Sequence, residues 1–157
     1  MGKNFNSKLS GKIGESLVVA ELGRRRLIAT AFAGNVPEID ILAFREKRSI
    51  PIQVKAFKEG SLRTKSDYYL KIDFDGRTQT ILGKKEDINH DPTFIIVKVG
   101  DQLGEDVFYI YDQGIIQDLV LKKHSSFIKK DDGVITKKPS SFDCSVNLKN
   151  LEDYRAK

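Results

Sequence analysis

Residues 37–57 read PEIDILAFREKRSIPIQVKAF, and this stretch decides the fold of the chain. Two apolar runs flank a charged turn centred on residues 46–47. Strands joined by such a turn pair antiparallel, and this register puts Asp40 opposite Gln53, one pair away from Lys55. Strand side chains alternate between faces, so the sequence predicts one buried face and one face that gathers these three polar groups. The predicted buried face consists of Ile39, Ile41, Ala43, Ile50, Ile52 and Val54.

The other face of this hairpin also carries Leu42, Phe44 and Phe57. A carboxylate, an amide and an ammonium therefore converge on a half-buried surface. Burial of such groups is costly unless they pair with one another or with an ion. The cluster predicts a functional site.

The length of 157 residues suits one compact domain spanning residues 1–157. No apolar run approaches the roughly 20 residues that a membrane span needs, so we expect no membrane partner. The first residues lack the apolar core of a secretory signal, and the lone Cys144 rules out an internal disulfide framework. These features predict a reducing, cytoplasmic setting.

The net charge is +5, and the basic residues fall in several runs, among them residues 24–26 and the stretch 122–138. A solvated face is the better explanation for any one run, but several runs on one small domain favour a nucleic acid partner. The candidate DNA-binding residues are Lys8, Lys12, Arg24, Arg63, Lys65, Lys84 and Lys85.

Apolar spacing predicts a helix over Ser7–Arg26. One stripe consists of Leu9, Ile13, Leu17 and Ala20, and a second group of Val18, Val19 and Leu22 lies opposite, so we expect packing on both faces. Glu15 falls in the second group beside Gly11 and Gly14, which allow another backbone to come close. A ligand role explains this carboxylate better than a place on the surface does.

The rest of the chain alternates strand, loop and helix patterns. The sequence predicts a strand over 27–33, a loop over 60–65, strands over 68–74 and 78–82, a hairpin of 94–99 with 107–111, a helix over 115–128, a loop over 129–141 and a last short strand and helical turn.

The order and spacing of Glu15, Asp40 and the run Gln53-Val54-Lys55 resemble the PD-(D/E)XK nuclease superfamily. The resemblance covers roughly residues 11–57. It implies an α/β (α+β) fold with a restriction-endonuclease-like αβββαβ core, in which helices flank a central mixed sheet.

This sequence departs from the superfamily pattern at two places. Glu38 and Ile39 separate Pro37 from the acidic ligand, and Gln53 stands where Asp or Glu is expected. A neutral amide oxygen is a weaker ligand for a hard cation than a carboxylate is. Glu38 is either an extra ligand or, as we favour, a counter-charge for Lys55 or a neighbouring arginine.

The resemblance implies Mg²⁺-dependent hydrolysis of phosphodiester bonds, with Mn²⁺ as another divalent choice. Asp40, Gln53, the backbone carbonyl of Val54 and Glu15 are the implied metal ligands. Lys55 is implied to orient the attacking water or to stabilise charge in the transition state.

Other site chemistries lack the residues they need. The chain has two histidines and one cysteine, which excludes a zinc finger, and it contains neither a P-loop nor a GxSxG elbow.

Two functions remain after these exclusions. The first is a DNA endonuclease, with duplex cutting of the homing or restriction type ranked ahead of Holliday-junction resolution. The second is a catalytically inactive DNA-binding module, which the presence of both Asp40 and Lys55 disfavours. One site cuts one strand, so cutting of both strands predicts a homo-oligomer, either a dimer or a tetramer.

Overall fold

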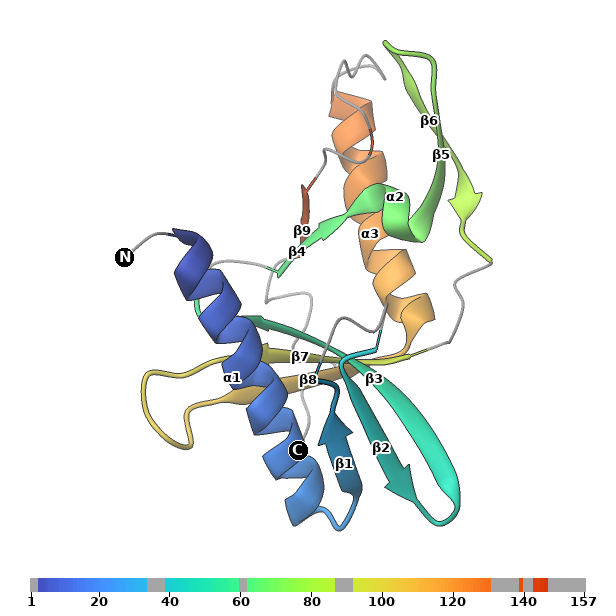
Figure 1. Cartoon of the computed structure of the whole chain (residues 1–157). Coiled ribbons are helices and arrows are strands. Elements are labelled where there is room, and N and C mark those ends of the chain that lie inside the picture. Colours follow the sequence, from blue (N-terminus) through green and yellow to red (C-terminus); the bar gives the residue numbers. More distant parts are fainter. Residues whose placement is uncertain are drawn as a thin grey trace. The chain divides into compact units, whose positions relative to one another are not determined.

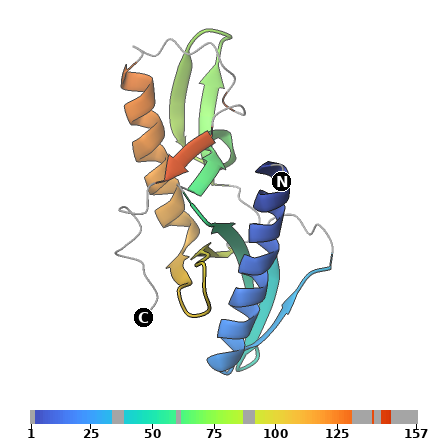
Figure 2. The same ribbon diagram turned by 90° about the vertical axis from the view of Figure 1, so that its left-hand side faces the viewer.

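The computed structural model describes residues 3–33, 39–59, 62–86, 92–130, 139 and 143–146. The chain divides into two compact units, which Figures 1 and 2 show as ribbons. Unit 1 comprises Met1–Gly60, His90–Gln113 and Leu151–Lys157, and unit 2 comprises Ser61–Asn89 and Gly114–Asn150. That the whole chain is a single domain stays a prediction. Within the described ranges, each helix is too short or too polar to cross a membrane.

Unit 1 is built on a five-stranded sheet with the order β1-β2-β3-β7-β8. The strands are β1 (Ile28–Ala31), β2 (Ile41–Arg45), β3 (Arg48–Phe57), β7 (Thr93–Lys98) and β8 (Val107–Tyr111). β3 and β7 are parallel, whereas the other neighbours pair antiparallel. The mixed sheet and its helices confirm the predicted α+β fold class, and β7 and β8 form the predicted second hairpin.

The hairpin of β2 and β3 has the register that the side-chain alternation predicts. Ile41 pairs with Ile52 and Arg45 with Arg48, which leaves Glu46 and Lys47 as the turn. Their φ angles are 51° and 67°, as a two-residue type I′ turn requires. A residue other than glycine costs roughly 1–2 kcal/mol in this left-handed region, so the turn is strained.

The helix α1 (Lys3–Arg24) covers one face of this sheet (Figure 1). Its packed side repeats every four residues, at Gly14, Val18 and Leu22. A Cβ at position 14 would overlap that of Ala56 on β3, so the helix lies against the strand where it has no side chain. The buried residues of this core are Val18, Ile41, Ala43, Ile52, Val54, Ile95, Val97 and Val99.

The prediction that both faces of α1 are packed is wrong. Leu9 is 48% exposed and Ile13 37% exposed, and Ala20 is exposed as well. A Cβ at Gly11 would meet nothing within 4 Å. The second predicted group and Leu17 of the first pack against the sheet, whereas the other three members of the first stripe are exposed.

Helix α1 ends in a Schellman motif. The N–H of Leu27 donates to the carbonyl of Leu22, and the N–H of Arg26 donates to that of Gly23, both at 3.0 Å. Arg26 has a φ of 63° at the position that glycine usually occupies. The motif turns the chain directly into β1.

Unit 2 contains two small antiparallel ladders and a long helix. The strand β4 (Leu62–Lys65) pairs with β9 (Asp143–Val146), and β5 (Leu70–Phe74) pairs with β6 (Gln79–Lys84). The one-turn helix α2 (Ser66–Tyr69) precedes β5, and α3 (Gln113–Lys130) begins at the last residue of unit 1 and continues through unit 2.

Two buried side chains of α3 hold it to α2 and to the β5–β6 hairpin. The Nε2 of Gln117 donates to the carbonyls of Tyr69 at 3.2 Å and Lys85 at 2.8 Å. The Nε2 of His124 lies 3.0 Å from the Oε1 of Gln79, and both side chains are 2% exposed.

Two predictions in unit 2 are wrong. The predicted loop at 60–65 contains β4, whose partner β9 lies far along the chain. Tyr68 and Tyr69 form part of α2 rather than of a strand, because the alternating pattern begins only at Leu70. The predicted loop after Lys129 and the last helical turn lie almost wholly outside the described residues.

Candidate active site

Asp40 lies just beyond the end of the β2–β3 ladder and is half-buried. Its N–H donates to the carbonyl of Ile52 at 2.9 Å, and its Oδ2 accepts from the N–H of Val54 at 2.7 Å. These two hydrogen bonds bracket Gln53. The structure therefore brings Asp40 beside Gln53, as the hairpin register predicts.

Gln53 is 8% exposed, and its Oε1 is buried without a hydrogen-bond partner among the described residues. An acceptor left in this state costs about 1–3 kcal/mol, and most buried polar atoms in proteins avoid it. The Oδ1 of Asp40 likewise accepts no hydrogen bond within the described part of the chain. Two oxygen atoms are therefore left to receive a ligand.

Lys55 lies two residues beyond Gln53 on the same face of β3 and is half-buried. Among the described residues it forms no ion pair. Phe57 follows on that face and is 9% exposed. An ammonium in this setting is suited to an anionic ligand, because no carboxylate of the described chain neutralises it.

Glu15 is half-buried on α1, and its Oε2 accepts from the Nζ of Lys12 at 2.6 Å. This hydrogen bond and the charge of Glu15 raise the pKa of Lys12, and the charge of Asp40 adds to the effect. The charges of both carboxylates therefore act on the ammonium of Lys12. Sequence reasoning missed this pairing, although the i,i+3 spacing on a helix was a readable signal.

Glu15 is connected to Asp40 through Lys12, on which the charges of both carboxylates act. Helix α1 covers the face of β3 that carries Val54 and Ala56, whereas Gln53 and Lys55 point to the opposite face. A role for Glu15 as a ligand stays a prediction. Glu38 lies outside the described residues.

The candidate donors suit a hard divalent cation, because they are a carboxylate, an amide oxygen and a main-chain carbonyl. The partnerless Oε1 of Gln53 is the observation that fits such an ion. In the described ranges, no three His, Cys, Asp or Glu side chains gather as a metal cluster. The set at Asp40 contains one such residue, so its metal affinity depends on neutral oxygens.

The predicted DNA-binding residues differ in whether they form ion pairs with described residues. Those that are exposed without a described ion pair are Lys8, Lys65 and Lys85. Those in ion pairs are Lys12 with Glu15 at 2.6 Å, Arg24 with Glu21 at 3.3 Å and Lys84 with Asp118 at 2.7 Å. The side chain of Arg63 lies outside the description.

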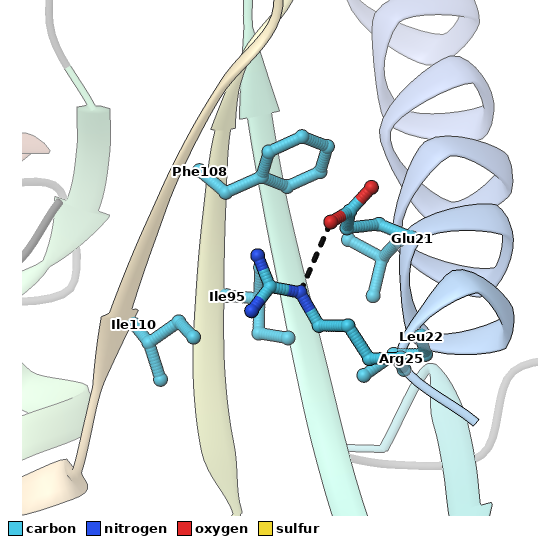
Figure 3. A pocket seen from close by; sticks show the side chains of 7 residues that line it. Glu21, Leu22, Arg25, Ile95, Phe108 and Ile110 are labelled. Carbon is cyan, nitrogen blue, oxygen red and sulfur yellow. Dashed lines mark hydrogen bonds and ion pairs between the residues drawn. The ribbon is translucent and has the colours of Figure 1, made fainter. Parts of the chain in front are cut away.

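A small cavity in unit 1 lies between α1, β7 and β8 (Figure 3). The Nε of Arg25 donates to the Oε1 of Glu21 at 3.0 Å, and the guanidinium extends over the sheet side chains. The lining residues are Val18, Glu21, Leu22, Arg25, Ile95, Phe108 and Ile110. None of the candidate site residues lines this cavity, and its walls are apolar apart from a neutralised ion pair.

No protein-family model matches the chain, and no curated protein is similar to it in sequence. Two solved structures resemble it in fold. A bacterial homing endonuclease has a TM-score of 0.48 at 14% identity, over 71% of this chain and 72% of its own. Hjc, a Holliday junction resolvase from the archaeal hyperthermophile Archaeoglobus fulgidus, has a TM-score of 0.42 at 17% identity, over 67% of this chain and 74% of its own. Similarity at this level assigns no activity to the present chain.

Proposed function

We propose that the protein is a metal-dependent endonuclease that hydrolyses phosphodiester bonds in duplex DNA. The observation that carries the proposal is the buried Oε1 of Gln53, which has no hydrogen-bond partner in the described part of the chain. Gln53 lies between Ile52 and Val54, the two residues of β3 that hydrogen-bond to Asp40. Lys55 follows on the same face without a described ion pair. The resemblance of residues 11–57 to PD-(D/E)XK nucleases supports the same reading.

Asp40, Gln53, the carbonyl of Val54 and Glu15 are the groups that would hold Mg²⁺ or Mn²⁺. When bound, such an ion lowers the pKa of a coordinated water and offsets the charge of the phosphate. The Val54 amide fixes the Asp40 carboxylate in advance, so little ordering is needed on binding. Glu15 contributes an oxygen only after it releases Lys12.

Lys55 acts as a point charge beside these oxygens. Its ammonium attracts the scissile phosphate and stabilises the negative charge that builds up on the phosphate oxygens in the transition state. Its half-buried position strengthens this effect, because solvent screens the charge less there.

We further propose that the active form is a dimer or a tetramer. One site of this kind cuts one strand, and two sites related by symmetry cut both strands of a duplex. Site-specific cutting of the homing or restriction type is our first choice, and resolution of a Holliday junction is the alternative within the enzyme class.

A catalytically inactive DNA-binding module is the second candidate function. The observation that favours it is Gln53 itself, because this residue gives the site one fewer negative charge than a carboxylate would. The two candidates predict the same affinity for DNA and differ only in cleavage.

The experiment that separates them is incubation with supercoiled plasmid and with a four-way junction, each with and without Mg²⁺. Cleavage that requires Mg²⁺ is the expected result, and the preferred substrate decides between duplex cutting and resolution. The matched control is Asp40→Asn, because an amide oxygen still accepts from Val54 and preserves the local fold. Binding without cleavage by the wild type would identify the inactive module, and cleavage by Asp40→Asn at the wild-type rate would refute the site.

A further inference from the structure

One end of the unit 1 sheet gathers six exposed cations. The pairing of Ile28 with Phe44 and of Arg45 with Arg48 places the end of α1 and the β2–β3 turn at this same end, as both ribbon views show (Figures 1 and 2). We call this surface the basic end, and it consists of Arg24, Arg25, Arg26, Arg45, Lys47 and Arg48.

Three of these cations form ion pairs, and they share two carboxylates. Arg24 and Arg25 both pair with Glu21, at 3.3 Å and 3.0 Å. Arg45 pairs with Glu46 at 3.3 Å. The surface is positive because three cations form no described ion pair and because Arg24 and Arg25 share the single carboxylate of Glu21.

Arg26, Lys47 and Arg48 form no ion pair with any described residue. Two of the three have positive φ, 63° for Arg26 and 67° for Lys47. The described part of the chain has one other non-glycine residue with positive φ, Glu46 in the same turn. All three of these strained positions lie at this end of the sheet, and cations occupy two of them although glycine would fill them at lower cost.

We propose that the basic end is a second contact surface for the phosphate backbone of duplex DNA, separate from the site at Asp40. Unpaired cations held in strained backbone are explained by a polyanionic ligand and not by folding, since glycine would fold better at two of the three positions. This inference rests on the proposed function and extends it from the reacting phosphate to the flanking duplex.

The position of the basic end sets the register of the contact. Arg48 precedes Gln53 by five residues on β3, which corresponds to about 17 Å at the strand rise of ~3.3 Å per residue. This distance equals about five base pairs of duplex at 3.4 Å each. The basic end therefore holds phosphates about half a helical turn from the cleaved bond and fixes the placement of the duplex without reading its sequence.

The first test compares two double variants that remove the same charge. Lys47→Gln/Arg48→Gln removes two cations of the basic end, and Lys71→Gln/Arg77→Gln removes two exposed cations of the β5–β6 hairpin. Affinity for a duplex is measured by fluorescence anisotropy over a range of KCl concentrations. We expect the first pair to flatten the slope of log affinity against log salt by up to about 1.8, at ~0.9 per phosphate contact, and the second pair to leave it unchanged. Equal changes in both variants would overturn the inference.

The second test uses Arg26→Gly/Lys47→Gly, which relieves strain and removes charge together. We expect the melting temperature to rise by about 2–4 °C per substitution, while duplex affinity falls and its salt dependence weakens. Because this variant is more stable than the wild type, weaker binding cannot be a failure to fold. Unchanged affinity would contradict a role in binding.

The two proposals fail in different ways. If the wild type cleaves DNA and all variants of the basic end bind equally well, only the basic end is refuted. If the wild type shows no salt-dependent binding to duplex DNA, the proposed function is refuted and the basic end with it. The basic-end variants should need more DNA to reach half of their maximal cleavage rate, whereas Asp40→Asn should lose cleavage and keep binding.

Discussion

Replacement of Gln53 by methionine should stabilise the metal-free protein. The Oε1 of Gln53 is buried without a described partner, and such an acceptor costs about 1–3 kcal/mol. Methionine has a similar length and no polar atom, so the substitution removes this penalty with little change in packing. We expect the free energy of unfolding to increase by about 1–2 kcal/mol, somewhat less than the full penalty because the amide nitrogen loses its hydration.

The same substitution should abolish the stabilisation that a metal gives. A ligand that binds only the folded protein adds about 2.7 kcal/mol at 100 times its dissociation constant. The wild type should therefore gain stability as Mg²⁺ or Ca²⁺ is added, while Gln53→Met stays level. The two unfolding curves should cross as the metal concentration rises.

Urea unfolding with and without metal measures both effects. The matched control is Gln117→Met, because Gln117 is as buried as Gln53 at 6% exposed but donates to two carbonyls. That variant should lose about 1–3 kcal/mol, since the carbonyls of Tyr69 and Lys85 lose a donor. If Gln53→Met is no more stable than the wild type without metal, Gln53 is satisfied in solution and the reasoning fails.

Three further outcomes follow from single residues. Gly14→Ala should lower the free energy of unfolding in urea by about 1–3 kcal/mol, because its Cβ would overlap that of Ala56. The Cβ of Gly11→Ala would meet nothing within 4 Å, so this control should raise the free energy of unfolding by up to ~1 kcal/mol through helix propensity. Equal effects of the two substitutions would contradict the packing of α1 on β3. Burial lowers the pKa of His124, so its contribution to stability is complete above about pH 6.5 and falls as pH drops below that value. The urea midpoint of the wild type should therefore be lower at about pH 5 than at about pH 8, and His124→Gln should reduce this difference. Gln53→Glu should tighten Mg²⁺ binding in calorimetry because it adds a charge, and unchanged binding would remove Gln53 from the site.

The hairpin and its polar face could be predicted because they depend on local alternation. Two apolar runs with a period of two leave one register that buries Ile41, Ala43 and Ile52 together, and the structure has that register. The proximity of Asp40 to Gln53 follows from the same pairing.

Elements that depend on distant partners could not be predicted in the same way. The strand β4 pairs with β9, and nothing within residues 60–65 shows that a partner exists so far along the chain. Helix α1 has apolar residues on two sides, and periodicity alone cannot decide which side is packed. Gly14 marks the packed side of α1, because the missing side chain lets the helix lie close to β3.

The sequence predicted which residues belong to the candidate site but not the contacts that their side chains make. Register places Asp40 and Gln53 together, whereas it says nothing of the sheet face to which Glu15 belongs. That choice depends on which side α1 covers. The orphaned oxygen of Gln53 and the pairing of Lys12 with Glu15 appear only when side chains are placed in three dimensions.

The parallel pairing of β3 with β7 has a consequence for how fast unit 1 folds. The chain leaves the sheet after Phe57 and returns at Thr93, so these neighbours close a loop of roughly 35 residues, at an entropic cost of about 3 kcal/mol. The hairpins on either side need only short loops and can form early. We expect docking of the β7–β8 hairpin onto β3 to limit the folding rate, so truncation of Ile95 should slow refolding more than truncation of Ile50 in the first hairpin does.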